Sequence, residues 1–337
     1  MRGAVVSAMA NPTGKVLALA GGVGGAKLAL GLAGVLQSEA LTVVVNTADD
    51  FEHLGLAISP DLDTVMYTLG GGIHEDQGWG RTDETFHVKE ELTAYGLQPE
   101  WFGLGDRDTA THLVRTQMLD AGYPLSQITE ALCARWRPGV RLLPMSDDRV
   151  ETHVVIDDET ADGGERAVHF QEWWLRLRAG VPARRFVSVG AGDAKPAPGV
   201  LEAIVAADFV VLPPSNPVVS VGTILGVPGV RDAIRERPVV GVSPIVGGAP
   251  VRGMADACLT AIGVETSATG VARHYGARND GGLLDAWIVD DTDAAAVADV
   301  AALNITARAV PAMMRDIPTA TALAASVLAV ADEVQSA

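Results

Sequence analysis

The chain has 337 residues, of which 48% are hydrophobic and 20% charged, which suits one large packed α/β domain or two smaller ones. Its formal net charge is −17 and it has no block of Lys or Arg, so we expect no nucleic-acid partner. Cys133 and Cys258 are the only cysteines, and both lie in apolar helical patterns, which indicates reduced core thiols in a cytoplasmic protein.

The N-terminal segment, residues 1–14, resembles a signal peptide only faintly, because it carries one Arg and a short apolar stretch. We expect a disordered leader, with translation starting either at Met1 or at Met9. The next apolar run, Val16–Leu36, is long enough for a membrane span, but six glycines and Lys27 lie inside it. We therefore expect no membrane contact and interpret the run as a strand, a turn and a helix.

A glycine-rich turn separates the first predicted strand from the first predicted helix. Its sequence is Gly21-Gly22-Val23-Gly24-Gly25-Ala26-Lys27, and a second β-branched run follows at Leu41–Val45. The order strand, glycine turn, helix and strand is typical of a nucleotide-binding unit. Gly22, Gly24 and Gly25 would leave backbone N–H groups open to a phosphate, with Lys27 in the first helical turn beside a diphosphate.

The turn matches neither standard phosphate-binding motif. The third glycine of the dinucleotide-binding pattern would fall on Lys27, and the Gly-Lys pair and the hydroxyl of the P-loop are missing. A turn that only lets the helix pack closely on the sheet is the alternative interpretation.

Two acidic loops follow the second strand. Asn46-Thr47-Ala48-Asp49-Asp50 comes directly after it, and Ser59-Pro60-Asp61-Leu62-Asp63 opens a short helix predicted over Thr64–Leu69. The segment Phe51–Pro60 has no clear period and predicts an exposed loop. Carboxylates this close repel one another unless a proton or a cation lies between them, and Mg²⁺ prefers one or two carboxylates together with phosphate oxygens. Alternatively, Asp61 and Asp63 only cap the helix.

Strand-like runs vanish over residues 78–138, which indicates a helical insertion. Helices are predicted over Phe86–Tyr95, Asp108–Ala121 and Leu125–Trp136. We expect His112, in the second of these helices, and His169, beyond the insertion, to be structural.

Aromatic side chains stand beside charged ones in this insertion, an arrangement that suits a planar ring with a polar tail. His87 and Lys89 could contact such a ligand. Alternatively, Phe86, Trp101 and Phe102 form the small core of the insertion.

Strands and helices alternate after the insertion, which predicts an α/β fold with a mainly parallel sheet. The predicted strands are His153–Ile156, Arg185–Val189, Asp208–Leu212, Val239–Val242 and Ala286–Val289. The predicted helices are Val200–Ala207, Gly229–Glu236, Met254–Ile262, Ala268–Tyr275 and the amphipathic C-terminal Thr319–Val334. The segment Asp157–Glu165 predicts a polar hairpin loop. The sheet domain would therefore comprise residues 15–77 and 139–337.

A proline-rich turn, Pro213-Pro214-Ser215-Asn216-Pro217, follows the apolar strand that ends at Leu212. Its prolines would hold Ser215 and Asn216 stiffly at the carboxyl end of a strand, where rigid polar groups suit phosphate or base recognition. A plain turn with no ligand is the alternative.

Taken together, these motifs resemble the CofD/FbiA transferases. The matching segments are Gly21–Lys27, Val45–Asp50, Ser59–Thr64, Trp101–Asp108, Pro214–Pro217, Ser243–Ile245 and Arg252–Asp256. The resemblance runs from about Val16 to the C-terminal helix. It implies a homodimer with a Rossmann-like three-layer domain, a helical insertion and a need for Mg²⁺. It also implies an activity in coenzyme F420 biosynthesis. A phosphoryl-linked three-carbon acid would move from a guanosine diphosphate conjugate to the ribityl hydroxyl of the deazaflavin Fo, releasing GMP.

The resemblance also suggests roles for individual residues. Asp50 and Lys89, with His87 beside them, would contact Fo. The guanosine diphosphate part would be held by Gly22, Gly24, Gly25, Lys27, Ser215 and Asn216. Mg²⁺ would lie among Asp49, Asp61 and Asp63, and Asp50 or Asp63 would accept the proton of the hydroxyl. We favour phosphoenolpyruvate as the acid, although 2-phospholactate and 3-phosphoglycerate differ from it by only a few atoms.

Two other functions compete with this one. A nucleotide-sugar-binding regulator of the same superfamily would carry other residues in place of Ser59–Thr64 and Pro214–Pro217. An NAD-dependent dehydrogenase would need a third glycine in the turn and an acid directly at the end of the second strand.

Overall fold

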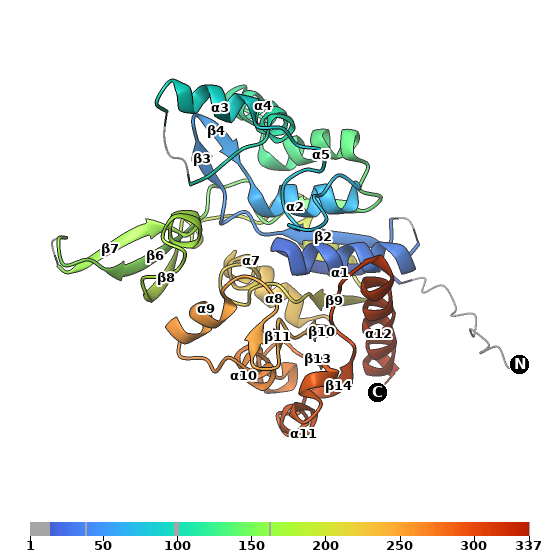
Figure 1. Ribbon diagram of the computed structural model, residues 1–337. Helices are drawn as coiled ribbons and strands as arrows, with labels where there is room; N and C mark the ends of the chain where they lie inside the picture. The colour runs from blue at the N-terminus through green and yellow to red at the C-terminus, as the bar shows by residue number, and fades with distance from the viewer. Residues whose placement is uncertain (1–13, 38, 98–100, 162, 337) are drawn as a thin grey trace, which may run out of the picture.

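The computed structural model describes residues 14–37, 39–97, 101–161 and 163–336 and is built around a seven-stranded sheet (Figure 1). The strand order is β14-β13-β10-β9-β1-β2-β5, and every neighbouring pair is parallel. The strands are β1 (Val16–Ala20), β2 (Leu41–Val45), β5 (Arg141–Pro144), β9 (Phe209–Leu212), β10 (Val239–Val242), β13 (Ala286–Asp290) and β14 (Thr306–Val310). The expectation of a mainly parallel sheet is confirmed, although the sequence predicted neither edge strand, β5 nor β14.

Helices cover both faces of the sheet because its strands present apolar side chains alternately to each side. Leu17 and Leu19 of β1 join one buried cluster, whereas Val16, Ala18 and Ala20 join the other. The first face is covered by α6 (Val200–Ala206), α7 (Val221–Gly226), α8 (Val230–Arg235), α9 (Ala255–Ala261), α10 (Ala268–Tyr275) and α11 (Ala296–Ala301). The second is covered by α1 (Gly22–Val35), α2 (Pro60–Leu69), α5 (Leu125–Trp136) and α12 (Ile317–Ser336). The Rossmann-like three-layer fold is therefore confirmed.

The order of the strands reverses between β1 and β9. From β1 the chain moves outward to β2 and then β5, and it later returns to β9 and moves the other way through β10, β13 and β14. The glycine turn follows β1 and the proline-rich turn follows β9, so both lie at the carboxyl ends of the strands that flank this switch point. Open α/β sheets bind their ligands at such a point.

The segment after Asp50 is a β-hairpin, so the predicted exposed loop is wrong. Strands β3 (Phe51–His53) and β4 (Leu56–Ile58) pair antiparallel around Leu54 and Gly55, whose φ angles are 52° and 74°. Positive φ at both central residues is typical of the tightest hairpin turns, but Leu rarely adopts it and so gave no signal. The helix that follows begins at Pro60, four residues earlier than predicted.

A second sheet of three antiparallel strands projects from the body on the left of Figure 1. It contains β6 (Glu151–Asp157), β7 (Glu165–His169) and β8 (Ala183–Val189), in the order β7-β6-β8. Two of these strands were predicted, but their assignment to the parallel sheet is wrong, because β6 and β7 form a local hairpin closed by the Asp157–Glu165 pair. A π-helical turn, Glu172–Arg176, follows β7.

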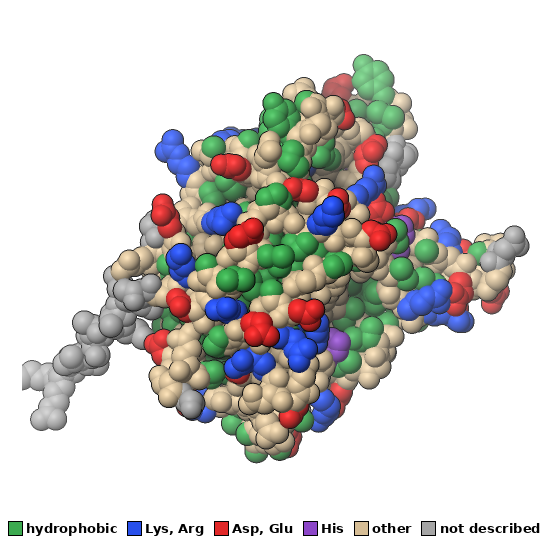
Figure 2. All heavy atoms as spheres, turned by 180° about the vertical axis from the view of Figure 1, so that it is seen from behind, with side chains coloured by type: hydrophobic (Ala, Val, Ile, Leu, Met, Phe, Trp, Pro, Cys, Tyr) green, Lys and Arg blue, Asp and Glu red, His purple; other side chains and the backbone are tan. Residues whose placement is uncertain are grey.

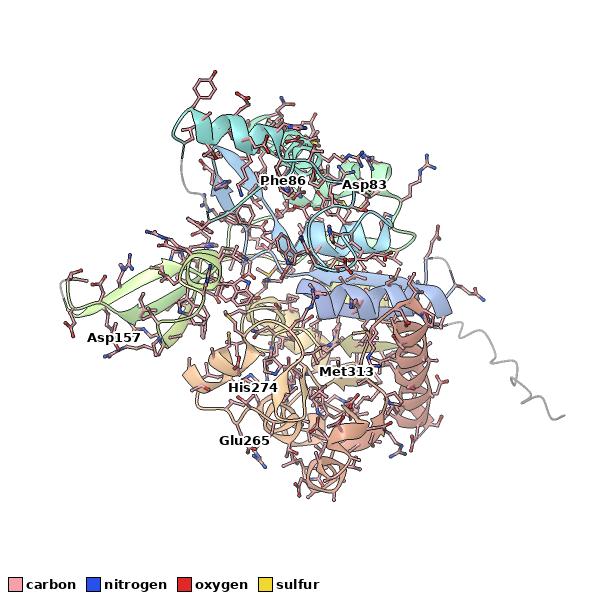
Figure 3. All side chains as sticks on the ribbon, viewed as in Figure 1. Asp83, Phe86, Asp157, Glu265, His274 and Met313 are labelled. Atoms are coloured by element: carbon pink, nitrogen blue, oxygen red, sulfur yellow. The ribbon has the colours of Figure 1, made fainter. Side chains whose placement is uncertain are left out.

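The insertion contains α3 (His87–Ala94) and α4 (Asp106–Asp120), followed by α5. Figure 3 shows Asp83 and Phe86 with these helices in the upper lobe. Helix α5 contributes Ile128 and Trp136 to the same core cluster as α1, α2 and α12. A two-stranded antiparallel ribbon, β11 (Ile245–Val246) and β12 (Ala249–Pro250), follows β10. The predicted leader, apart from Gly14, lies outside the described residues.

Helix α12 is the one helix of the described chain that is long and apolar enough to cross a membrane by length and composition. Its apolar side is buried at Leu323, Val327 and Ala331, in the cluster shared with α1. The run Val16–Leu36 divides into β1 and α1, as the sequence predicted, but the helix already begins at Gly22, so most of the predicted glycine turn forms the first turns of α1. Figure 2 shows Lys and Arg interspersed with Asp and Glu over the rear face, without a continuous basic patch.

Candidate active site

A cavity of about 590 Å³ opens at the switch point. Its walls include the glycine turn, the proline-rich turn, the two acidic loops and, from the insertion, Trp101 and Phe102. We call it the switch-point cavity. The structure thus brings together segments that are separated by more than 190 residues in the sequence.

The glycine turn packs tightly and also faces the cavity. A Cβ on Gly24 would collide with the carbonyl oxygen of Pro214, and one on Gly25 would lie 2.5 Å from Ser215 Oγ. Gly22 has φ +62°, and its N–H donates to Asp61. The close-packing interpretation is therefore correct in part, because glycine is needed for this contact. Val23 and Gly24, at the start of α1, line the cavity and present the positive end of the helix to it.

Lys27 lies in the second turn of α1, because the helix begins at Gly22; its placement in the first turn is wrong. It lines the cavity, and its Nζ donates to the carbonyl oxygen of Met314 at 3.0 Å. The neighbouring Met313 is labelled in Figure 3, on the segment after β14. Burial and the charge of Arg252 lower the pKa of Lys27.

Asp61 caps helix α1 rather than its own helix. Its Oδ1 accepts from Gly22 N–H at 2.8 Å, and its Oδ2 accepts from Asn46 Nδ2 at 2.9 Å. Burial raises the pKa of this carboxyl to about 6 despite both hydrogen bonds. A carboxylate that lines the cavity is thereby fixed beside the glycine turn.

Asp49 and Asp50 each keep an oxygen with no partner among the described residues. Asp49 is buried and lines the cavity, and its Oδ1 has no hydrogen bond. Asp50 Oδ1 is also without a partner, while Oδ2 accepts from Ser59 Oγ at 2.6 Å. Burial is the main cause that raises the pKa of both carboxyls, and the charge of Asp61 adds to it. Such groups favour a proton or a cation nearby.

Asp63 contacts side chains of the insertion. It forms a buried ion pair with Arg115 of α4, and its Oδ2 lies 3.6 Å from His112 Nδ1. Arg115 Nη1 lies 3.0 Å from the same His112 nitrogen and donates to the carbonyl oxygen of Ala57 in the hairpin at 3.3 Å. The far nitrogen of His112 lies 3.4 Å from Asp108. Asp63, Asp108 and His112 all line the cavity.

The sequence did not identify Arg115, and it gave His112 only a structural role. Asp108, His112 and Arg115 are spaced by four and three residues and therefore share one face of α4. This spacing in a helix of low hydrophobicity was the available signal. The other histidine, His169, packs its ring 5.7 Å from that of Phe51 and accepts from Gln171 N–H, as a structural residue would.

Ser215 and Asn216 both line the cavity. Ser215 Oγ accepts from Gly21 N–H at 3.1 Å and donates to Gly21 O at 2.8 Å, which joins the two turns. Asn216 Oδ1 accepts from the N–H groups of Val218 and Val219. Both side chains are held stiffly, as the prolines predicted.

His87 and Lys89 lie away from the switch-point cavity. The His87 side chain is 78% exposed beside Glu90. Lys89 lines a separate hollow of about 410 Å³ with His53 and Phe102, and its Nζ lies 2.7 Å from where a Cβ on Gly103 would be. Residues 102–103 therefore separate Lys89 from the cavity. The predicted contacts of His87 and Lys89 with an acceptor stay predictions.

The aromatic residues of the insertion are divided between packing and the cavity. Phe51 of the hairpin packs edge-on against Phe102 at 4.9 Å between ring centroids and stacks on Trp101 at 6.5 Å. Trp101 and Phe102 also line the cavity, whereas Phe86 is exposed.

The donor set suits Mg²⁺ completed by a substrate. Among the described residues, no three His, Cys, Asp or Glu side chains are spaced to hold a metal by themselves. Mg²⁺, however, commonly binds one or two carboxylates together with waters and phosphate oxygens. The unpartnered oxygen of Asp49 and the fixed carboxylate of Asp61 provide such a pair on the cavity wall.

The parallel sheet, the glycine turn and the cavity at the switch point define a Rossmann-like α/β protein with a cavity where open α/β sheets bind their ligands. The family model described as 2-phospho-L-lactate transferase CofD matches residues 16–332. The chain belongs to this family of transferases, and the resemblance noted in the sequence is confirmed.

Several curated relatives are similar over nearly the whole chain, and each carries the name phosphoenolpyruvate transferase. The protein from Streptomyces griseus is 63% identical over 96% of this chain and 100% of its own length. Those from Thermobifida fusca and Nocardia farcinica are 61% and 55% identical, over 95% and 90% of this chain and 99% and 91% of their own. A solved structure from Bacillus halodurans, a member of the UPF0052 family, covers 94% of this chain and 99% of its own with a TM-score of 0.60 and 20% identity, which is a likeness of fold.

Proposed function

We propose that this transferase acts in coenzyme F420 biosynthesis. It would move a phosphoenolpyruvyl group from a guanosine diphosphate conjugate to the ribityl hydroxyl of Fo, releasing GMP. The observation that supports this most directly is the pair of buried carboxylates, Asp49 and Asp61, on a cavity wall shared with the start of α1. The names of the relatives favour phosphoenolpyruvate over 2-phospholactate as the acid.

The chain's own groups would bind and orient the donor. The N–H groups of Val23 and Gly24 and the positive end of the α1 dipole would face the diphosphate, because the Gly22 N–H already donates to Asp61. Ser215 and Asn216 would contact the nucleotide. Mg²⁺ held by Asp49 and Asp61 would neutralise charge on the diphosphate. Trp101 and Phe102 would exclude water from the acceptor side, which strengthens every electrostatic interaction inside the cavity.

Asp50 is the better proton acceptor of the two predicted bases. Asp50 Oδ1 and Asp63 Oδ2 both lack a hydrogen-bond partner among the described residues. Burial raises the pKa of Asp50, however, whereas Asp63 is ion-paired with Arg115. Asp63 lines the cavity and Asp50 does not, but Asp50 is hydrogen-bonded to Ser59, whose neighbours Ile58 and Pro60 line it. A base with a raised pKa is closer to its working range near neutral pH. Asp63 would then position the insertion rather than move a proton.

The function is tested by incubating the protein with Fo, Mg²⁺ and each donor conjugate, in which phosphoenolpyruvate, 2-phospholactate or 3-phosphoglycerate is joined to GMP through one diphosphate. Mass spectrometry should identify a phosphodiester of Fo together with GMP, formed fastest from the phosphoenolpyruvate conjugate. If no conjugate yields that product, the nucleotide-sugar-binding regulator becomes the better proposal. Homodimer formation and a cytoplasmic location stay predictions from the resemblance.

Replacing Asp50 with asparagine is expected to lower turnover by about 10²–10⁴-fold, because that is the usual contribution of one general base. Affinity for Mg²⁺ in the presence of GDP should stay within about twofold, since Asp49 and Asp61 remain. Turnover follows from the rate of product formation, and affinity from calorimetry. Wild-type turnover in the variant would exclude Asp50 as the base.

Affinity for Mg²⁺ should decrease as the solution becomes acidic. Protons compete with the cation for Asp61, whose pKa is about 6, so lowering the pH from 7.5 to 5.5 should weaken binding at least about fourfold. The raised pKa of Asp49 adds to this effect. Calorimetric titration with Mg²⁺ in the presence of GDP measures it, and Asp61→Asn should reduce the pH dependence. An affinity that is constant over this range would remove both carboxylates from the metal site.

A further inference from the structure

Two basic side chains, the half-buried Lys27 and the exposed Arg252, line the switch-point cavity and have no acidic partner there. Lys27 and Arg252 are the only Lys or Arg among the described residues that line it. Neither Arg252 nor Lys27 forms an ion pair within the described residues. The positive charge inside the cavity is therefore left for a ligand.

Arg252 is held in place through backbone groups alone. Its Nη2 donates to the carbonyl oxygen of Asp76 at 2.8 Å, and its Nη1 donates to that of Gln77. A guanidinium group has five N–H donors in one plane, so three remain after these two bonds. The side chain is thus oriented, and part of its donor set is still available.

Arg252 lies over the first turn of α1. A Cβ on Gly78 would be 2.9 Å from Arg252 Nη1 and 2.7 Å from Val23 Cγ1, so the guanidinium and the start of the helix share one neighbour. Asp61 contacts the same turn, because it accepts from Gly22 N–H. An anion at the start of α1 would accordingly have both the carboxylate pair and Arg252 as neighbours.

We propose that Arg252 binds the carboxylate of the three-carbon acid carried by the donor and so selects donors that have this group. The inference rests on the proposed function, which supplies the donor. Its diphosphate is accommodated by the helix N–H groups and by a cation at Asp49 and Asp61, which leaves the carboxylate as the remaining negative charge. A planar guanidinium matches a carboxylate with two parallel hydrogen bonds. Lys27 adds a second positive charge on the same side.

The neighbouring loop gives this assignment a structural consequence. Because Arg252 also holds the backbone of Asp76 and Gln77, a donor carboxylate bound to it would be linked to residues 74–80. That loop carries Trp79, which lines the cavity mouth and is otherwise exposed. The donor would therefore stabilise the loop that covers it.

The test compares two ligands that differ by the acid alone. Calorimetry in the presence of Mg²⁺ gives the affinity of the full-length protein for the donor conjugate, in which phosphoenolpyruvate and GMP share one diphosphate, and for GDP. Arg252→Gln should bind the conjugate about 10- to 100-fold more weakly than the wild type, since it loses a charge-assisted pair of hydrogen bonds. Its affinity for GDP should change less than about threefold. The affinity of Arg252→Lys for the conjugate should lie between those of the wild type and Arg252→Gln, because lysine keeps the positive charge but cannot form two parallel hydrogen bonds.

The matched control is Arg273→Gln, a substitution at an exposed position of α10 that does not line the cavity. Thermal melting establishes that each variant is folded, and Arg252→Lys serves as the test if Arg252→Gln is not. Equal losses for the conjugate and GDP would overturn the proposal, because Arg252 would then serve the phosphates or the loop. Unchanged affinity for both would overturn it as well.

The binding measurement does not require Fo and therefore stands apart from the transfer assay. If the conjugate binds in an Arg252-dependent way but no phosphodiester of Fo forms, the proposed reaction fails and the carboxylate site remains. If the phosphodiester forms and Arg252→Gln binds both ligands normally, the reaction remains and the carboxylate site fails.

Discussion

Replacing Arg115 with methionine is expected to lower the free energy of unfolding by about 3–5 kcal/mol, the usual cost of removing one partner from a buried ion pair. The Arg115 side chain is 1% exposed, and its loss would leave the Asp63 carboxylate buried without compensation. The variant would also lose the hydrogen bond to Ala57 O, which links α4 to the β3–β4 hairpin. Urea unfolding followed by circular dichroism measures the effect.

A double-mutant cycle separates the ion pair from the shape of the side chain. Asp63→Asn combined with Arg115→Met should destabilise less than the sum of the single changes, because neither buried charge is then left alone. Arg107→Met, an exposed substitution in the first turns of the same helix, should stay within about 0.5 kcal/mol of the wild type. A loss below about 1 kcal/mol for Arg115→Met would mean that water reaches Asp63.

The sequence predicted the sheet and the turns that flank its switch point because these features depend on short-range patterns. The β-branched run of β2 and the glycines after β1 are visible within a few residues of each other. Edge strand β5 is shorter, and its first residue, Arg141, is exposed, so its pattern does not stand out. Strand β14 similarly carries the exposed Arg308 at its centre.

The contacts that Asp61 and Asp63 make in the site could not be predicted, because they join segments that are distant in the sequence. Asp63 and Arg115 are 52 residues apart, and only the packing of α4 against the hairpin makes their charges meet. Asp61 looked like a cap for the helix it begins, yet it caps α1, which lies 39 residues earlier. In both cases the sequence shows an acidic residue beside the predicted site, but it does not show which residue the carboxylate contacts.

Lys89 and His87 show a limit of assigning residue roles from a family resemblance. The resemblance placed both near an acceptor, but in this structure neither lines the switch-point cavity. His87 is exposed, and Lys89 lies beside Gly103 in a separate hollow. Positions carried over from a family do not include such local geometry.

Replacing Asp49 with asparagine is expected to change activity and stability in opposite directions. Turnover should decrease by about 10²–10³-fold, because the variant removes one of the two carboxylates proposed to bind Mg²⁺, which would neutralise charge on the diphosphate. The metal-free protein should become more stable at pH 7. Burial and the charges of Asp61 and Asp50 raise the pKa of Asp49, so the folded state binds this proton more tightly than the unfolded state. Stability from this group is therefore lost as the pH rises from about 4 through the raised pKa, and asparagine, which has no charge to bury, avoids the loss.

Unfolding with urea at pH 5 and pH 7 in the presence of a chelator distinguishes this explanation from a general repacking of the site. The wild type should lose stability between pH 5 and pH 7 relative to Asp49→Asn, and Mg²⁺ with GDP should reverse the order by stabilising only the wild type. Asp120→Asn, at an exposed position near the end of α4, is the matched control and should change neither stability nor turnover. If Asp49→Asn proved less stable than the wild type at pH 7 without metal, the carboxylate would be satisfied inside the protein, and the cavity wall would lack the unsatisfied negative charge on which cation binding depends.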